Sequence, residues 1–409
     1  MPHPSAIYTP LPHEDSIRLL SLHFANHTDD EIHCDLKLVR RPQWKGRYTA
    51  LSYVWGPEGD TVPIWIDGHR MMVRRNLFEY LRLWRPPRGP ATIWIDALCI
   101  DQSSNDERGH QVRIMADIYR DAEQVYSWLG PTRDDSDWLF AKIAKNLKAK
   151  WLKKPWRRIQ RDEHTGRDSK RMRDGRLVAR AVAAVCARPY FSRRWILQEL
   201  YVASRLRLLC GTDLVEGSSF GSLYKKLDLE YNMQGLVADR KDHVNAVTEI
   251  FDVCDLMVYC GETKSSLPST SCLLGAVTTY QAAQCSVPHD KVFALIGLLP
   301  EAEPSVVRGL VDYDTPLAQL VVDIMHSNTS QAFSHLFDLS NVIASLMPDV
   351  VSLSSTNLHH KSVVFHISKD IGINKARWVA QSAQPIEIGC TRSTCWLVDL
   401  ESNILNVSG

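Results

Sequence analysis

The sequence predicts an α/β fold from three observations in one stretch of the chain. Residues 93–100 form an almost unbroken apolar run of strand length, which is typical of a strand covered on both faces. Residues 104–107 then give a capping-box pattern, and apolar side chains recur at helical spacing through residues 112–122. Residues 125–129 form a second short β-type run. A strand, a helix and a strand of this length indicate a parallel crossover.

The first half of the chain follows the same rules. Apolar or alternating runs predict strands at residues 16–22, 32–39, 48–55 and 205–210. Residues 64–73 predict a hairpin that turns at Asp67 and Gly68, a pair favoured in tight β-turns. Asn76 is expected to cap a helix that ends before two prolines and places Leu77, Tyr80, Leu81 and Trp84 on one face.

Later elements are read from spacing and capping residues. Residues 177–187 have a helical pattern, and Ser192 is expected to cap the helix that follows. Residues 217–299 read as mostly helical, and a further helix is expected to open at Thr315. Beyond residue 340 the pattern weakens into short β-like runs, such as residues 362–367 and 395–399.

Length and composition limit the class of protein. The 409 residues allow two or three domains, and a net charge of +1 gives no electrostatic case for nucleic acid. No apolar run approaches the roughly 18 residues that a membrane span requires. The chain has 10 cysteines without paired metal-ligand spacing, and its beginning lacks the features of a secretion signal. We therefore expect a cytoplasmic protein with free thiols, no metal and no membrane span.

Composition and pattern suggest four segments. Residues 1–45 supply lead-in strands, and residues 46–211 form the main α/β domain. A basic insertion at about residues 145–180 carries 14 Lys and Arg against four Asp and Glu, and reads as a solvated segment rather than a phosphate-binding patch. Residues 212–330 form a mainly helical extension, and residues 331–409 an uncertain tail.

Three stretches together resemble the heterokaryon-incompatibility (HET) domain of filamentous fungi. They are ALSYVWG at residues 50–56, WIDALCIDQ at 94–102 and FSRRWILQE at 191–199. Supporting matches include IRLL at residues 17–20, Glu107 with Arg108, and Gln111 with Val112 in the crossover helix, WLG at 128–130 and a segment at 289–298. The family usually has Asn at the position of Asp101, and its downstream aromatic-rich segment has only a remote counterpart here.

The resemblance implies a protein of fungal self/non-self recognition, a form of innate immunity in which HET domains trigger programmed cell death. Partners would be a second copy or a cognate incompatibility or sensor protein. HET domains are also remotely similar to TIR domains, which implies a flavodoxin-like parallel sheet flanked by helices. Some TIR domains hydrolyse NAD with a Glu four residues after a Trp, and here these are Glu199 and Trp195. TIR domains often have Cys where this chain has Ile196.

A site for NAD as substrate, with no resident cofactor, follows from this resemblance. Glu199 would be the catalytic carboxylate, because cleavage of the nicotinamide–ribose bond builds positive charge on the sugar. Trp195 offers a flat face for stacking. Ligands in open parallel sheets lie outside the carboxyl ends of strands, where the chain places Tyr53, Trp55, Gly56, Asp101 and Gln102.

Other interpretations stay open. Glu199 can form an ion pair with Arg193 or Arg194 instead of acting in catalysis, and Trp195 can be a core residue. Asp96, inside the apolar run, needs a partner if it is buried, and Asp101 and Gln102 can simply begin a helix. The domain can also be a non-catalytic interaction module that signals by self-association.

A serine hydrolase is a further alternative. Residues 217–221, GSSFG, have the spacing of a nucleophile elbow, with Ser219 as nucleophile. The preceding stretch is short and half polar, whereas an elbow follows a buried strand.

Overall fold

The computed structural model describes residues 7–25, 27, 29–146, 170–231, 273–299 and 308–317, some short pieces near these segments, and the backbone of strands between residues 361 and 408. The chain divides into two compact units. The first is Met1–Ser265 with Ala282–Gln284, and the second is Ser266–Gln281 with Cys285–Gly409. Within the described residues, no helix combines the length and apolar composition needed to cross a bilayer.

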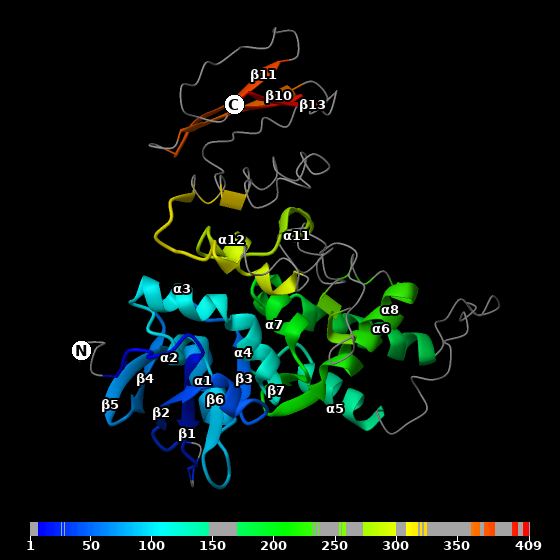
Figure 1. Cartoon of the computed structure of the whole chain (residues 1–409). Helices are drawn as coiled ribbons and strands as arrows, with labels where there is room; N and C mark the ends of the chain where they lie inside the picture. The colour runs from blue at the N-terminus through cyan, green and yellow to red at the C-terminus, as the bar shows by residue number, and fades with distance from the viewer. Residues whose placement is uncertain are drawn as a thin grey trace, which may run out of the picture. The chain divides into compact units, whose positions relative to one another are not determined.

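The first unit is built on one mixed sheet, which in the described residues has nine strands (Figure 1). In space their order is β5-β4-β2-β1-β6-β3-β7-β8-β9. Their bounds are β1 Ser16–Leu22, β2 His33–Arg40, β3 Thr49–Tyr53, β4 Thr61–Ile66, β5 His69–Arg74, β6 Ala91–Trp94, β7 Gln124–Trp128, β8 Leu206–Cys210 and β9 Asp213–Glu216. The α/β class predicted from the sequence is confirmed.

The centre of this sheet is parallel. Strand β3 pairs in parallel with β6 on one side and β7 on the other, and β7 pairs in parallel with β8. Strands β6 and β7 therefore run in the same direction with β3 between them, as the crossover predicts. Strand β1 adds to this core antiparallel to β6, so the lead-in strands extend the same sheet.

Helices accompany the strands along the first unit (Figure 1). Their bounds are α1 Arg75–Leu83, α2 Asp96–Cys99, α3 Asn105–Arg113, α4 Met115–Asp121, α5 Ser136–Asn146, α6 Lys170–Cys186, α7 Ile196–Val202 and α8 Gly217–Tyr231, with the 3-10 helix η3 at Pro189–Ser192. The predicted helix at residues 177–187 is confirmed as the second half of α6. Residues 147–169 of the basic insertion lie outside the described residues.

The expected strand at residues 93–100 is wrong beyond Trp94. Ile95 is still extended, and Asp96 then begins the short helix α2, where its carboxylate accepts a hydrogen bond from the Ala97 amide at 2.7 Å. A carboxylate at a helix start satisfies a free backbone amide. The apolar pattern therefore predicted the burial of these residues correctly but their conformation wrongly. A short helix such as α2, buried on one side, needs the same apolar residues as a strand.

The crossover helix begins as predicted and then breaks. Ser104 caps α3 and accepts a hydrogen bond from the Glu107 amide at 3.2 Å, which confirms this part of the capping box. Ile114 leaves the helical region, with φ −104° and ψ 4°, so α3 and α4 are separate. The expected cap at Ser192 is also wrong, because Ser192 ends η3 and Trp195 stands at the cap of α7.

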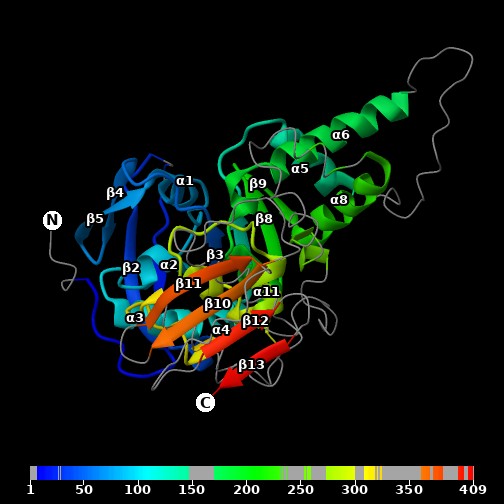
Figure 2. The same cartoon turned by 90° about the horizontal axis from the view of Figure 1, so that it is seen from above.

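The second unit contains an antiparallel sheet whose strands lie in the order β11-β10-β12-β13 (Figure 2). These described strands are β10 Lys361–Ser368, β11 Gly372–Ala380, β12 Cys395–Asp399 and β13 Ile404–Ser408. They confirm the β-like runs read in the tail. Helices α11 Leu273–Thr279 and α12 Asp290–Phe293 belong to the same unit. Most of the expected helical region between residues 232 and 272 lies outside the described residues.

Asn76 joins three elements and is not the cap that the sequence suggests. Helix α1 begins one residue earlier, at Arg75. The Asn76 side chain donates to the Val54 carbonyl at 2.6 Å and accepts from the Trp128 indole at 3.0 Å. It therefore ties α1 to the ends of β3 and β7.

Replacing Asn76 by alanine should destabilise the first unit by about 1–3 kcal/mol, because the partly buried Val54 carbonyl loses its donor and the Trp128 indole keeps only the Asn76 backbone carbonyl. Urea denaturation of the wild type and the variant measures this difference. A change near zero would contradict the role assigned to the Asn76 amide.

Candidate functional site

The carboxyl ends of the parallel strands carry a buried polar network. Ser52 on β3 lies directly opposite Ser127 on β7. The Tyr190 hydroxyl from η3 lies between them, 2.8 Å from each serine oxygen. Since ligands bind at this edge of open α/β sheets, these hydroxyls lie where the fold predicts a site.

Glu199 is the innermost charge of this network. Its side chain is 1% exposed and its Oε2 accepts a hydrogen bond from the Ser52 hydroxyl. Arg193 lies beside it, with both terminal nitrogens 3.5 Å from the two carboxylate oxygens. Glu199 also lies in the first turn of α7, where the helix dipole favours negative charge. In this conformation the carboxylate is satisfied by the protein itself.

A second carboxylate, that of Asp96, lies nearer the surface. It accepts from the Trp55 indole at 2.9 Å and from the Ala97 amide, and its residue is partly exposed. Arg193 and the buried Tyr53 are its other electrostatic neighbours. Arg193, Trp55 and Asp96 are partly exposed and form a rim next to the buried Glu199, which Arg193 contacts directly.

Burial shifts the protonation of both acids. Removal from water raises the pKa of Glu199 and of Asp96, and the nearby Arg193 guanidinium partly opposes this. Burial lowers the pKa of Arg193, but Glu199, Asp96 and two neighbouring tyrosines together raise it by more, so the net shift is upward. One cation therefore faces two acids, which favours retention of a proton on the pair of carboxylates. Carboxylates of raised pKa cluster at functional sites.

The raised pKa of Glu199 has a consequence for stability. Between its ordinary pKa of 4.5 and its raised value, the folded chain holds a proton that the unfolded chain has lost. The free energy of unfolding should therefore fall as pH rises through this window, and Asp96 contributes in the same direction. Denaturant titrations across the window should show a flatter pH dependence for Glu199→Gln than for the wild type. Equal slopes would contradict the shift at Glu199.

The other predicted ligand residues, those of the first and third motif blocks, lie at or just beyond the end of β3 and at the cap of α7. Gly56 has φ +83°, and its carbonyl accepts from the Arg74 guanidinium at 2.6 Å. The same guanidinium lies 5.1 Å from the centre of the Trp55 ring. Trp195 is partly exposed. Tyr53, Trp55 and Glu199 are therefore gathered around Asp96 and Arg193, with Gly56 just beyond them.

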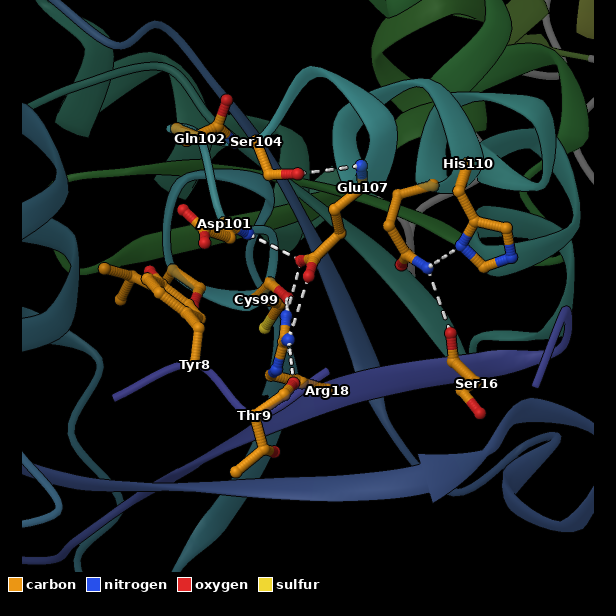
Figure 3. Close-up of polar contacts among 12 residues, drawn as sticks. Tyr8, Thr9, Ser16, Arg18, Cys99, Asp101, Gln102, Ser104, Glu107 and His110 are labelled. Carbon is orange, nitrogen blue, oxygen red and sulfur yellow. Dashed lines mark hydrogen bonds and ion pairs between the residues drawn. The ribbon is translucent and has the colours of Figure 1, made fainter. Parts of the chain in front are cut away.

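Asp101 and Gln102 organise the start of α3 (Figure 3). The Asp101 carboxylate accepts from the Ser103 amide at 3.0 Å and from its hydroxyl at 2.6 Å. Gln102 donates to the Asp96 carbonyl at 2.9 Å and so joins the network through the backbone. These contacts are those of the helix-start alternative, and they leave the proposed ligand role untested.

A buried ion pair lies behind this turn (Figure 3). Arg18 on β1 is 2% exposed and forms two bonds with Glu107 on α3, at 2.5 and 2.9 Å. Arg18 also donates to the Cys99 carbonyl at 3.2 Å and to that of Thr9. A cavity of about 550 Å³ adjoins the pair, and its lining includes Asp101. The motif matches at residues 17–20 and at Glu107 are thereby explained as one structural contact.

Ser219 does not occupy a strand-to-helix turn. It is the third residue of α8, and it is 8% exposed. The strand before it, β9, pairs antiparallel with β8 at one end of the sheet order. This geometry differs from that of a nucleophile elbow, which exposes its serine at a sharp turn.

Sequence analysis missed the hydroxyl groups of the network. Ser52 is a polar residue on a strand that is otherwise mostly apolar and aromatic, and Tyr190 directly precedes the third motif block. A polar residue inside a buried strand needs a partner, so Ser52 was a detectable signal. Tyr190 and Ser127 gave no such signal, because their meeting depends on how the strands are paired. Among the described residues, His, Cys, Asp and Glu form no group of three that could hold a metal ion.

Comparison with known proteins covers this same region. Residues 48–199 match the family described as heterokaryon incompatibility protein (HET). Over 136 residues the chain is 38% identical to heterokaryon incompatibility protein 6, OR allele, of Neurospora crassa. The aligned segment covers 30% of this chain and 20% of the relative. The chain thus spans about a fifth of the length of this curated relative. No solved structure matches. The matches support the resemblance that the three motif blocks predicted, and all three lie inside the matched residues.

Proposed function

We propose that this chain acts in fungal heterokaryon incompatibility, and that its segment 48–199 triggers regulated cell death on recognition of non-self. The match to the HET family and the similarity to a Neurospora protein named for incompatibility support this role. Glu199 is the last residue of the matched segment, so Ser52, Asp96, Ser127, Tyr190, Arg193 and Glu199 all lie inside it.

The proposed chemistry is hydrolysis of NAD with Glu199 as the central residue. The observation that carries it is the pair of acids of raised pKa that both face Arg193, namely the buried Glu199 and the partly exposed Asp96. The strand order supports a TIR-like fold, because β6-β3-β7-β8 is the order second-first-third-fourth of a flavodoxin-like sheet. In that fold the ligand binds where the order reverses, which here is the carboxyl edge of β3 and β7.

The residues suit the steps of this reaction. The bond between nicotinamide nitrogen and ribose C1′ breaks, the electron pair leaves with nicotinamide, and water adds to C1′ with release of a proton. Positive charge develops on the ribose, which the Glu199 carboxylate stabilises while it orients the water. Trp55 and Trp195 supply stacking surfaces at the rim. Because Glu199 is 1% exposed, Arg193 has to move aside before substrate reaches it.

A non-catalytic interaction module is the second candidate, and the burial of Glu199 favours it. The carboxylate already has Ser52 and Arg193 as partners, so its role can be to fix α7 against β3. Signalling would then depend on self-association or on binding to a cognate sensor protein.

Expression in a filamentous fungal host tests the proposed role. Wild-type chain should cause death of the expressing compartments, measured by uptake of a vital dye, and a chain lacking residues 48–199 should not. The wild-type chain should also be tested in cells that are fused with an incompatible strain. Survival of such cells, with the folded chain present, would contradict the proposed role.

A further inference from the structure

A second cavity lies at the opposite edge of the parallel core. Its volume is about 320 Å³, and its lining includes Thr49 and Ile93, which are paired neighbours at the beginning of β3 and on β6. We call it the aromatic cavity, after Tyr80, Trp84 and Tyr126, which also line it. Its size is at the lower end of the range of small-ligand pockets, so it suits a single-ring or double-ring molecule.

The aromatic walls are held in place by their own hydrogen bonds. The Trp84 indole donates to the Gly211 carbonyl at 3.0 Å, and the Tyr126 hydroxyl accepts from the Gln124 side chain at 3.2 Å. The two rings lie 6.0 Å apart between centres and are tilted by 56°. Both residues remain partly exposed. Fixed, partly exposed aromatic rings bind a planar group without ordering cost.

One deeply buried residue of the aromatic cavity, Tyr80, carries a polar group with no partner in the described residues. Tyr80 is 1% exposed and lines the cavity. In the part of the chain that the structure describes, its hydroxyl forms no hydrogen bond, although its ring packs against Trp128 at 6.0 Å. The hydroxyl oxygen keeps some solvent access, so a ligand atom in the cavity can exchange a hydrogen bond with it.

Two charges of opposite sign complete the lining. Arg47 and Glu123 are both exposed and both line the cavity. Neither side chain forms a hydrogen bond or ion pair with the residues that the structure describes, although Glu123 acts through space on Arg205. An arginine suits a carboxylate, and a glutamate suits an ammonium group.

We propose that the aromatic cavity binds a small aromatic zwitterion, namely an amino acid whose ring carries a polar atom, as in tyrosine. The ligand ring packs against the partly exposed rings of Trp84 and Tyr126, which contact each other, and its polar atom bonds the Tyr80 hydroxyl. The ligand carboxylate pairs with Arg47, and its ammonium group pairs with Glu123. This site is separate from the Glu199 network and does not depend on the proposed NAD chemistry.

Calorimetric titration of the full chain tests the assignment, with L-tyrosine, 3-(4-hydroxyphenyl)propionate and tyramine as probes. Saturable binding of L-tyrosine is expected, weakened about tenfold or more by Arg47→Gln and by Glu123→Gln, as expected for loss of a charge-assisted hydrogen bond. The binding affinity of the propionate, which lacks the ammonium group, should fall only in Arg47→Gln. The binding affinity of tyramine, which lacks the carboxylate, should fall only in Glu123→Gln.

Tyr80→Phe provides a matched test of the cavity floor. This substitution should weaken the binding of L-tyrosine but leave the binding of L-phenylalanine unchanged, because only L-tyrosine carries a ring hydroxyl. Arg47 and Glu123 are exposed, so their variants should keep the wild-type unfolding midpoint. Absence of saturable L-tyrosine binding to the wild type would overturn the proposal. Binding that is indifferent to either charge variant would overturn the zwitterion assignment.

Discussion

The purified chain with Glu199→Gln is expected to hydrolyse NAD about a hundredfold more slowly than the wild type, or slower still. Loss of one well-placed electrostatic group raises a barrier by about 3 kcal/mol, and Glu199 is the only one of the two site acids proposed to face the developing charge. The glutamine keeps the size of the side chain and its bond to Ser52, so the fold should survive. Release of nicotinamide, followed by chromatography, measures the rate.

A matched control shows whether the lost activity is specific to Glu199 or follows from replacing any glutamate by glutamine. Glu31 is 73% exposed and distant in sequence from every residue of the network, so Glu31→Gln should hydrolyse NAD at the wild-type rate. Both variants should first be shown to unfold at similar denaturant concentrations. Equal NAD hydrolysis by Glu199→Gln and the wild type would refute the catalytic role of Glu199.

Loss of the Arg18 side chain should produce the largest change in stability. Arg18→Met removes the partner of Glu107 and leaves a carboxylate that is 13% exposed without its counter-ion, although the Asp101 amide still donates to it at 2.7 Å. The carbonyls of Thr9 and Cys99 lose a donor as well. Breaking a buried pair on one side typically costs about 3–5 kcal/mol, and denaturant unfolding should show a loss of this size.

Two further variants give this prediction its controls. Arg75 forms an exposed pair with Asp60 at 2.8 Å, so Arg75→Met should cost less than about 1 kcal/mol. Adding Glu107→Gln to Arg18→Met should restore part of the loss, since no uncompensated charge then remains buried. If Arg18→Met and Arg75→Met destabilised the chain equally, the Arg18 pair would have no special role.

The sequence was informative wherever local pattern and burial agree. Ser16–Leu22 and the hairpin at Asp67 and Gly68 follow from alternation and turn chemistry, and the structure confirms both, with φ 49° and 75° at the turn. Residues 93–100 were misread because a buried helix turn and a buried strand have the same apolar composition over four residues. Hydrophobic content alone does not separate them.

The candidate site shows the same division. An ion pair of Glu199 with Arg193 or Arg194 was one open interpretation of their spacing, and the structure pairs Glu199 with Arg193 at 3.5 Å. The contact of Ser52 with Tyr190 joins residues 138 positions apart, and no local pattern encodes it. It arises because β3 and β7 are adjacent in the sheet while η3 crosses their carboxyl ends. Pairing of distant strands is decided by the whole core, which is why this part of the site required the structure.

NAD consumption through Glu199 is the proposed means by which this chain causes cell death. The most direct measurement is the NAD content of fungal cells that express the wild type beside cells that express Glu199→Gln, with both proteins folded and equally abundant. NAD depletion and death confined to the wild type are the predicted result. Steady NAD in wild-type cells that still die would contradict the claim and would favour signalling by assembly.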